Sequence, residues 1–320
     1  MIIDIHTHLF ESAAAFPQAW LDVFYGFGES KRGFKRAIMG DEAFERWQAD
    51  FDQSGRVEAL IADMDEAGID KSVVLPLDWA IVCQQEPKIS VWRTNEYVAE
   101  AQRKYPDRII GFVGVDPLRG EEAIKLLETG VKEWDLKGVK IMPAAFKVTD
   151  PKVQAFMSKV DELRIPALFH MGSDPHPFVI RHGDPADLDT LSSWYPKMKM
   201  VAAHCAMGYE DVLISFMWFY EGLMYTDTAM LQYELMQSPW HFTLHMRYLM
   251  DRIPRSLVIG SDWPAIKTPP LLTHKEWFDA FRNLKIPEQF LQLGLGIRDF
   301  SQEEKGMILG ENARSLLGIE

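Results

Sequence analysis

The chain contains 320 residues, of which 47% are hydrophobic, and it carries a formal net charge of −13 at pH 7. A chain of this length and composition can bury a large core, either as one large α/β domain or as two smaller domains. The acidic balance, with a pI near 5.2, argues against nucleic acid or an anionic membrane surface as the main partner.

The first predicted element is a strand at residues 1–8, with the sequence MIIDIHTH. Side chains alternate between the two faces of a strand, so Asp4, His6 and His8 are expected on one face and the apolar residues on the other. Two imidazoles on one face, at the end of an apolar strand, make half of a metal site. A pair of surface histidines is the alternative, and the residues further along the chain decide between the two.

Residues 10–54 are rich in aromatic side chains, with Lys31, Arg32, Lys35 and Arg36 among them. We interpret this stretch as a loop-and-helix insertion after the first strand rather than a separate domain. It is too short for a core of its own, and aromatic side chains at this density need a surface on which to pack.

From residue 54 onward, predicted helices and strands alternate. Ser54 is expected to cap a helix that has apolar residues at helical spacing and ends at Gly68. The β-branched run at 71–77 is typical of a buried parallel strand. Further strands are predicted at 108–115, 136–142, 165–170, 198–204, 223–226 and 257–261. Helices are predicted at 91–104, 121–134, 151–163, 187–194, 209–220, 235–250 and 301–317.

Together with the first strand, this gives eight strands that alternate with helices at the spacing of a parallel βα repeat. The pattern predicts an α/β protein in which residues 1–320 form a single (β/α)₈ TIM barrel, with its active site at the carboxyl ends of the strands. A doubly wound open sheet is the alternative. Neither G-x-G-x-x-G nor G-x-x-x-x-G-K-[ST] occurs, so the usual nucleotide-binding fingerprints are absent.

Polar residues at the predicted strand ends form a set that can meet at one rim of such a barrel. They are His6, His8, Lys140, His170, His204 and Asp262. Chance can place one histidine at a strand end, but four imidazoles and an aspartate on one rim are a much less frequent accident. A buried histidine bonded to the backbone is a reasonable alternative for His204 alone and a poor one for the set.

Several short motifs occur in the order and at the barrel spacing of a known family. They are D-I-H-T-H at the start, G-V-K at 138–140, F-H-M-G at 169–172, A-H at 203–204, G-S-D-W-P at 260–264 and G-E-N-A at 310–313. With them the chain resembles the amidohydrolase superfamily, and within it the amidohydrolase 2 branch. That branch includes aminocarboxymuconate-semialdehyde decarboxylase, γ-resorcylate decarboxylase and dicarboxylate lactonases. The resemblance spans the full barrel, and residues 10–54 match it least.

The resemblance implies a divalent metal held by His6, His8, His170 and Asp262, with water completing the shell. Zn²⁺ is expected, and Mn²⁺ or Fe²⁺ also suit three imidazoles and a carboxylate. Bound water would fall from a pKa of about 15.7 toward about 7. The resemblance assigns catalytic roles to Asp262, which would carry that water's proton, and to His204, which would polarise the substrate.

Lys140 has three interpretations. It can clamp a substrate carboxylate, which we favour slightly, or it can be carbamylated and bridge two metal ions, or it can be a structural lysine paired with an acid. One metal ion is therefore expected, and two if Lys140 is carbamylated. Many relatives carry a histidine where this chain has Met142, so any role of that histidine is absent here. Because His8 is present, Asp4 is expected to lie deeper in the barrel as support.

Residues of two kinds are candidates for binding the substrate. Trp79, Trp263 and the aromatic insertion could line an apolar or aromatic pocket. A substrate carboxylate could be bound by basic side chains, each of which is more often a solvated surface charge. These are Arg93, Lys140, Lys147, His176 and Arg181.

The leading hypothesis is a metal-dependent hydrolase that acts on a C–O or C–N bond of a small cyclic or carboxylated substrate, aromatic ones included. Non-oxidative decarboxylation of an aromatic or muconate-type acid at the same site is the alternative. A TatD-like nuclease ranks third, because that group has an acid where this chain has Lys140 and because the net charge of −13 is unfavourable for phosphate. A non-catalytic protein ranks last, since none of the expected ligands is missing.

The expected partner is a small-molecule substrate, with neither nucleic acid nor membrane. Only Cys83 and Cys205 occur in the chain, so no disulfide framework is implied. No signal-peptide pattern opens the chain and no apolar run approaches about 20 residues, so a cytoplasmic location is expected. Residues 216–240, rich in Met and Trp, are expected to belong to the core rather than an interface. A homodimer is expected by analogy with the family.

Overall fold

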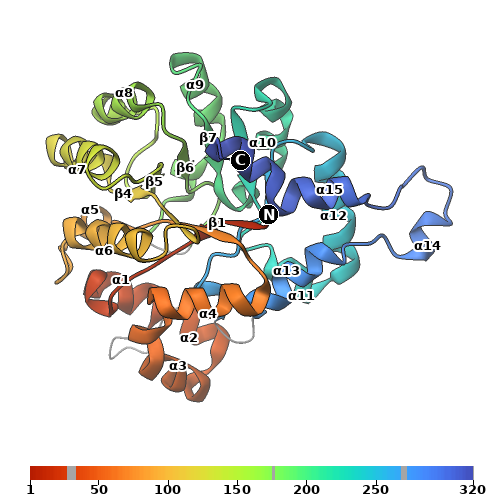
Figure 1. The fold of residues 1–320 in the computed structure, drawn as a ribbon, viewed down its shortest axis with the longest axis horizontal. Coiled ribbons are helices and arrows are strands. Elements are labelled where there is room, and N and C mark those ends of the chain that lie inside the picture. The colour runs from red at the N-terminus through yellow and green to blue at the C-terminus, as the bar shows by residue number, and fades with distance from the viewer. Residues whose placement is uncertain (27–33, 175–176, 268–271, 320) are drawn as a thin grey trace.

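Parallel strands form a ring with helices outside it in the computed structural model (Figure 1). The structure describes residues 1–26, 34–174, 177–267 and 272–319. The strands in this part of the chain are β1 (Ile3–Thr7), β2 (Lys71–Val74), β3 (Ile109–Gly111), β4 (Val113–Gly114), β5 (Val139–Ile141), β6 (Ala167–Phe169), β7 (Met200–Ala202), β8 (Met224–Asp227) and β9 (Leu257–Val258).

The strands pair in sequence order and all pairs are parallel, as a (β/α)₈ barrel requires. The predicted strand at 108–115 is divided into β3 and β4, which Phe112 separates. Backbone hydrogen bonds join β1 to the segment after β9: Ile5 N–H donates to Ile259 O (3.0 Å) and Asp262 N–H donates to His6 O (2.9 Å). The first and last strands are therefore neighbours, which agrees with the predicted barrel and not with an open sheet.

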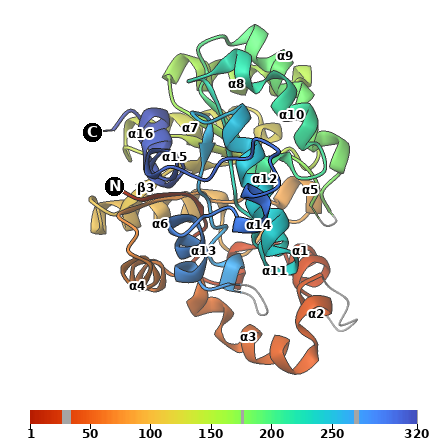
Figure 2. The same cartoon turned by 90° about the vertical axis from the view of Figure 1, so that its right-hand side faces the viewer.

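The helices surround the strands, with the carboxyl-terminal helices beside the first strand (Figures 1 and 2). Those that follow successive strands are α4 (Val57–Ala67), α5 (Ala80–Cys83), α6 (Val91–Lys104), α7 (Glu121–Lys132), α8 (Gln154–Leu163), α9 (Ala186–Trp194), α10 (Glu210–Met217), α11 (Gln232–Gln237) and α12 (Pro239–Arg252). The last are α13 (His274–Arg282), α14 (Glu288–Leu291), α15 (Gln302–Gly306) and α16 (Asn312–Leu317).

The barrel interior is filled by apolar side chains from nearly every strand. Ile3 of β1, Val73 of β2, Leu168 of β6 and Val201 of β7 belong to one buried cluster, while a larger cluster fills the space between strands and helices. On β5 the neighbours of Lys140 belong to the outer cluster. Because side chains alternate along a strand, Lys140 points inward, where other strands carry apolar residues.

The insertion after β1 is more helical than the sequence indicated. It contains α1 (Gln18–Trp20), a π-helical turn at Leu21–Tyr25, α2 (Phe34–Met39) and α3 (Asp41–Ser54). Its aromatic side chains form a cluster with Trp79, Met142 and Phe178, which follow β2, β5 and β6. The insertion therefore packs over the carboxyl ends of the strands. Ser54 ends α3 instead of capping α4, and its hydroxyl donates to Phe51 O (2.8 Å).

Two surface features complete the fold. The expectation that residues 216–240 are core is wrong for Trp218, Phe219 and Trp240, whose exposed fractions are 60%, 67% and 53%. Their rings lie at the surface around α10 and α12. Among the helices that the structure describes, none is long and apolar enough to cross a membrane.

Candidate metal centre and substrate pocket

The histidines of β1 are placed by an irregularity in the strand. The register between β1 and β2 shifts between Asp4 and Thr7, so strict alternation does not hold there. His6 and His8 line the pocket at the carboxyl ends of the strands, whereas the Asp4 carboxylate accepts hydrogen bonds from the Ser261 hydroxyl (2.5 Å) and from His274 Nε2 (2.8 Å). Asp4 therefore does not share a face with His6 and His8, contrary to the sequence prediction. Its carboxylate is buried and supports the strand through its hydrogen bonds from Ser261 and His274.

Asp227, at the end of β8, fixes the orientation of two histidines. Its Oδ1 accepts the backbone N–H groups of His204 and Ala229, both at 3.0 Å, and its Oδ2 lies 2.9 Å from Nδ1 of His6. His204 has a left-handed backbone, with φ +61°, and Asp262 has φ +59°. Such conformations cost about 1–3 kcal/mol each and persist where the surrounding structure enforces them, often at functional sites.

Oxygen atoms hold the Nδ1 atoms of three imidazoles, and the Nε2 atoms of two of them meet other polar groups of the site: that of His6 lies 3.3 Å from Lys140 Nζ and that of His8 lies 3.0 Å from Asp262 Oδ1. Carbonyl oxygens only accept, so Nδ1 of His8 donates to Leu75 O (2.6 Å) and Nδ1 of His204 donates to Ala229 O (3.3 Å). Nδ1 of His6 donates to Asp227 in the same way. A neutral imidazole whose Nδ1–H is held by a carbonyl or carboxylate is oriented to bind a metal through Nε2.

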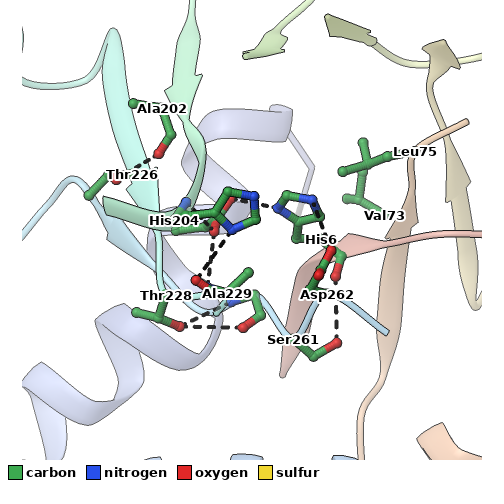
Figure 3. Close-up of polar contacts among 12 residues, drawn as sticks. His6, Val73, Leu75, Ala202, His204, Thr226, Thr228, Ala229, Ser261 and Asp262 are labelled. Atoms are coloured by element: carbon green, nitrogen blue, oxygen red, sulfur yellow. Dashed lines mark hydrogen bonds and ion pairs between the residues drawn. The ribbon is translucent and has the colours of Figure 1, made fainter. Parts of the chain in front are cut away.

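His6, His8 and Asp262 offer ligand atoms that lie within 4.8 Å of one another. Asp262 Oδ1 lies 3.0 Å from His8 Nε2 and 3.6 Å from His6 Nε2. Figure 3 shows the imidazoles of His6 and His204 side by side, with Asp262 next to His6. A second group, His6, His204 and Asp227, also has this spacing, but both Asp227 oxygens are already engaged by N–H donors.

His170, a further predicted ligand, lines the same pocket but belongs to neither of these two groups. Its ring centroid lies 4.8 Å from that of His204, and its buried Nε2 has no hydrogen-bond partner among the described residues. A buried imidazole nitrogen without a partner is unfavourable unless something binds it. The Nε2 atoms of His6 and His8 face the same carboxylate oxygen of Asp262, an arrangement of donor atoms that a cation can occupy. The donor set therefore fits a divalent ion.

Burial and neighbouring charges set the protonation states of these groups. Burial lowers the pKa of His6, His170 and His204 below the usual range for histidine, which favours the neutral, metal-binding form. Burial opposes the ionisation of Asp262, but the hydrogen bond with His8 outweighs it and holds the pKa of Asp262 below its usual range.

These residues form the floor of a pocket of about 740 Å³, including its open mouth. The aromatic insertion and Trp79 line it, as the sequence predicted. The remaining lining residues come from loops at the carboxyl ends of the strands. The aromatic lining consists of Phe10, Phe16, Trp20, Phe24, Tyr25 and Trp79.

Lys140 is fully buried in this pocket, with its Nζ 3.3 Å from Nε2 of His6. Burial lowers the pKa of Lys140 to about 8, although the nearby carboxylates of Asp227 and Asp262 oppose this effect. No carboxylate of the described residues forms an ion pair with it. The interpretation of Lys140 as a structural lysine paired with an acid therefore has no support in the geometry.

Several predicted substrate-binding residues lie elsewhere. Arg93, on α6, does not line the pocket, because its guanidinium is paired with Glu11 (2.6 Å), Glu96 (2.9 Å) and Glu100 (2.7 Å). Trp263 is fully buried away from the pocket and its indole N–H donates to Asp63 (2.6 Å). Lys147 and Arg181 line a separate surface cleft. His176 lies outside the described residues.

Two acidic residues of the site were missed by sequence reasoning. Asp227 directly follows the predicted strand at 223–226, which was ended one residue too early, so the strand-end rule contained the signal. Asp174 lines the pocket with its carboxylate 3.6 Å from Nε2 of His170. It lies in the loop after β6, four residues beyond His170, where no spacing pattern marks it.

A closed ring of parallel strands, with histidines and an aspartate converging at the carboxyl ends, defines an α/β-barrel enzyme with a candidate metal centre. Comparison with known families identifies it further. The chain belongs to the amidohydrolase family, whose model matches residues 3–319. No curated protein sequence matches the chain.

Solved structures share the whole fold at low sequence identity. A 2,6-dihydroxybenzoate decarboxylase from Rhizobium is 14% identical, with a TM-score of 0.65 over 99% of this chain and 98% of that chain. A 5-carboxyvanillate decarboxylase from Novosphingobium aromaticivorans, complexed with manganese and 4-hydroxy-3-methoxy-5-nitrobenzoic acid, is 15% identical, with a TM-score of 0.65 over 99% and 96%. A probable 2-pyrone-4,6-dicarboxylic acid hydrolase from Acinetobacter baumannii is 18% identical, with a TM-score of 0.61 over 99% of both chains.

Proposed function

We propose that the protein is a metal-dependent, non-oxidative decarboxylase of an aromatic or similarly planar unsaturated carboxylic acid. One observation carries the proposal: the candidate metal centre opens into a pocket lined by aromatic rings, in which Lys140 is the only Lys or Arg among the described lining residues. Aromatic walls suit a flat ring, and one cation suits one carboxylate. Decarboxylases are also among the solved structures with this fold.

His6, His8, His170 and Asp262 would hold the ion in this proposal. Nitrogen and oxygen ligands suit both Zn²⁺ and Mn²⁺, and manganese is the ion in the 5-carboxyvanillate decarboxylase structure. A divalent ion at this position supplies Lewis-acid polarisation of a substrate oxygen.

The residues of the chain then have separate roles. Lys140 binds the substrate carboxylate, and the Nε2 lone pair of neutral His204 accepts a hydrogen bond from a substrate hydroxyl. Asp262 carries a proton to the ring carbon that bears the carboxylate. A C–H bond forms at that carbon, the C–C bond to the carboxylate breaks, and its electron pair stays on the ring as CO₂ leaves. The carboxylate and one proton thus become CO₂ and a neutral ring that carries hydrogen where the carboxylate was.

Hydrolysis of a lactone is the second candidate. It is supported by the fold shared with the probable 2-pyrone-4,6-dicarboxylic acid hydrolase and by the position of Asp262, which could accept a proton from water. The single Lys in the described pocket lining speaks against a dicarboxylate substrate, for which two cationic partners are expected.

A direct assay separates the two candidates. The purified protein, loaded with Mn²⁺ or Zn²⁺, is incubated with 2,6-dihydroxybenzoate, 5-carboxyvanillate and 2-pyrone-4,6-dicarboxylate, while CO₂ release and loss of the acid are followed together. We expect CO₂ in equal amount to the aromatic acid consumed. Asp262→Asn should lower kcat by about 10²–10⁴-fold, whereas Asp211→Asn, on the exposed first turn of α10, should not. Lactone opening without CO₂ would overturn the decarboxylase proposal in favour of the hydrolase.

A further inference from the structure

Two tryptophans of the pocket lining have the same unusual feature. Trp20, from the insertion, and Trp79, from the loop after β2, both line the pocket and are only 3% and 4% exposed. Their rings stack, with centroids 5.3 Å apart and planes at 25°. Each has a buried indole N–H without a hydrogen-bond partner among the described residues.

Buried tryptophans outside the pocket do not share this feature. The indole N–H of Trp263 donates to Asp63 (2.6 Å), and that of Trp277 donates to Gly260 O (2.8 Å). Both of these residues are fully buried. Outside the pocket, each of these two buried indole N–H groups thus has an acceptor within the protein. Because a buried donor left unpaired is unfavourable, and the described residues supply no acceptor, a ligand in the pocket can provide one for these two indoles.

Neither indole is free to turn toward another acceptor. Trp20 is stacked between Phe16 (4.7 Å) and Phe24 (4.8 Å). Trp79 follows Asp78, which receives two hydrogen bonds from Arg119, at 2.6 and 3.2 Å, and one from the N–H of Ala80 (3.2 Å). The packing and this clamp hold both rings in place before any ligand binds, which reduces the entropic cost of binding.

We infer that the indole N–H groups of Trp20 and Trp79 donate hydrogen bonds to an oxygen substituent of the substrate, away from the carboxylate that Lys140 binds. The inference rests on the proposed function and narrows its substrate class. The substrate is a planar carboxylic acid with a second group that bears lone pairs, such as a methoxy, carbonyl or hydroxyl oxygen. A site built to donate to such a group discriminates against analogues that lack it.

Binding of matched ligand pairs tests this inference without turnover. Affinities of the metal-loaded protein are measured by titration calorimetry for 3- and 4-methoxybenzoate and for 3- and 4-ethylbenzoate, which have similar size but lack the acceptor. We expect tighter binding of a methoxy ligand than of its ethyl counterpart. Trp79→Phe and Trp20→Phe keep a ring and delete the donor. Each should weaken methoxy binding about fivefold to tenfold, as the loss of one neutral hydrogen bond predicts, and should leave ethyl binding unchanged.

Trp194→Phe, at a half-exposed position on α9, serves as the control and should change neither affinity. Equal losses for methoxy and ethyl ligands would mean that the rings act by packing alone and would overturn the inference, as would equal wild-type affinities for each pair. If the methoxy preference holds and no CO₂ is released from any acid, the decarboxylase proposal fails and this inference stands. If CO₂ is released but methoxy and ethyl ligands bind equally, the decarboxylase proposal stands and this inference fails.

Discussion

At the scale of single residues, the Asp227 carboxylate organises the centre without lying among the predicted metal ligands. It receives N–H groups from His6, His204 and Ala229, so it sets the ring orientation of one proposed ligand and the backbone of one proposed catalytic residue. Gly260 allows the last strand to approach this group closely, since a side chain there would begin 2.9 Å from Cβ of His6 and 3.3 Å from Cβ of Asp227.

Asp227→Asn is predicted to weaken metal binding about 10- to 100-fold, because the carboxylate that orients His6 and raises its basicity is lost. The measurement is competition with a metal-buffering chelator, and Asp211→Asn is the control. Wild-type affinity in Asp227→Asn would show that His6 is not a ligand.

Lys140→Met is predicted to raise KM for a carboxylate substrate at least about tenfold, with a smaller change in kcat, because one buried cation is removed while the volume is kept. Steady-state kinetics and metal content are measured together. One ion per chain in both proteins fits the clamp interpretation. A fall from two ions to one, with mass spectrometry of the wild type showing added CO₂ on Lys140, would instead establish a carbamylated bridge.

At the scale of elements, an ion pair fixes the loop that carries Trp79. The side chains of Arg119 and Asp78 are 7% and 3% exposed and form two hydrogen bonds. Burial raises the pKa of the neighbouring Asp116 carboxyl to about 7, and its side chain caps the turn that carries Arg119. The clamp thus joins the loop after β2 to the turn after β4.

Arg119→Met is predicted to destabilise the protein by roughly 3–5 kcal/mol, because it leaves the buried Asp78 carboxylate without its partner. Arg46→Met removes an exposed pair with Glu42 and should cost less than about 1 kcal/mol. Urea unfolding of both variants gives the two values. Similar small losses would show that the clamp does not hold the loop.

His245 predicts a pH dependence of stability, because it joins three helices. Located on α12, it lies 2.7 Å from Glu234 on α11 and 2.8 Å from Glu210 on α10, and His241 also pairs with Glu234. Burial alone would lower the pKa of His245, but the hydrogen bonds to Glu210 and Glu234 raise it to about 9. The unfolded value is about 6.5.

Because the folded pKa is the higher one, the stabilisation by charged His245 is complete below about pH 6.5 and is lost as the pH rises through about 9. The free energy of unfolding should therefore fall by about 1–3 kcal/mol across this window. Denaturant unfolding at several pH values measures it. His245→Gln should be less stable at pH 6 and should lose this part of the slope, and an unchanged slope in the variant would contradict the assignment.

The sequence predicted the strands, the helices and the residues at the strand ends better than it predicted strand register and side-chain partners. Apolar β-branched runs mark the barrel strands because both strand faces are buried, and His6, His8, His170, His204 and Asp262 all lie where the strand-end rule puts them. The register shift in β1 depends on pairing with β2, which no local pattern encodes. Phe44, Trp47 and Phe51 have the spacing of one face of a helix, which agrees with α3. The aromatic residues before them lack such a regular spacing, so the helix was not predicted separately from the rest of the insertion.

At the scale of the whole molecule, the candidate metal centre brings together residues from both ends of the chain. His6 lies in β1 and His8 directly follows it, His170 follows β6 and Asp262 follows β9. An ion bound to all four would therefore hold the ring together as well as complete the site. Charged side chains such as Arg93 were assigned wrongly from sequence because their partners, Glu11 and Glu100, are set only by this global arrangement.

Removal of the metal by a chelator is predicted to lower the melting temperature, and addition of Mn²⁺ or Zn²⁺ should restore it. Binding to the native state alone stabilises by about 2.7 kcal/mol when the free ion is at 100 times its Kd. For a chain of this size, that corresponds to a shift of several degrees, on the order of 5 °C. Calorimetry with and without chelator measures it. An identical melting temperature in both conditions would argue against tight binding at the native site.

The insertion leaves and re-enters the barrel at nearly one point. Phe10 N–H donates to Gly55 O (2.9 Å), and the N–H of Ala13 donates to the Asp52 carboxylate (2.6 Å). Because the ends are tied together, its length can change at a small loop-closure cost while the strands keep their pairing. Mutation and recombination can therefore diversify this segment, which carries five of the six aromatic residues of the described pocket lining, Trp20 among them, while leaving the floor of the pocket intact. Grafting it between barrels is a route to new substrate ranges.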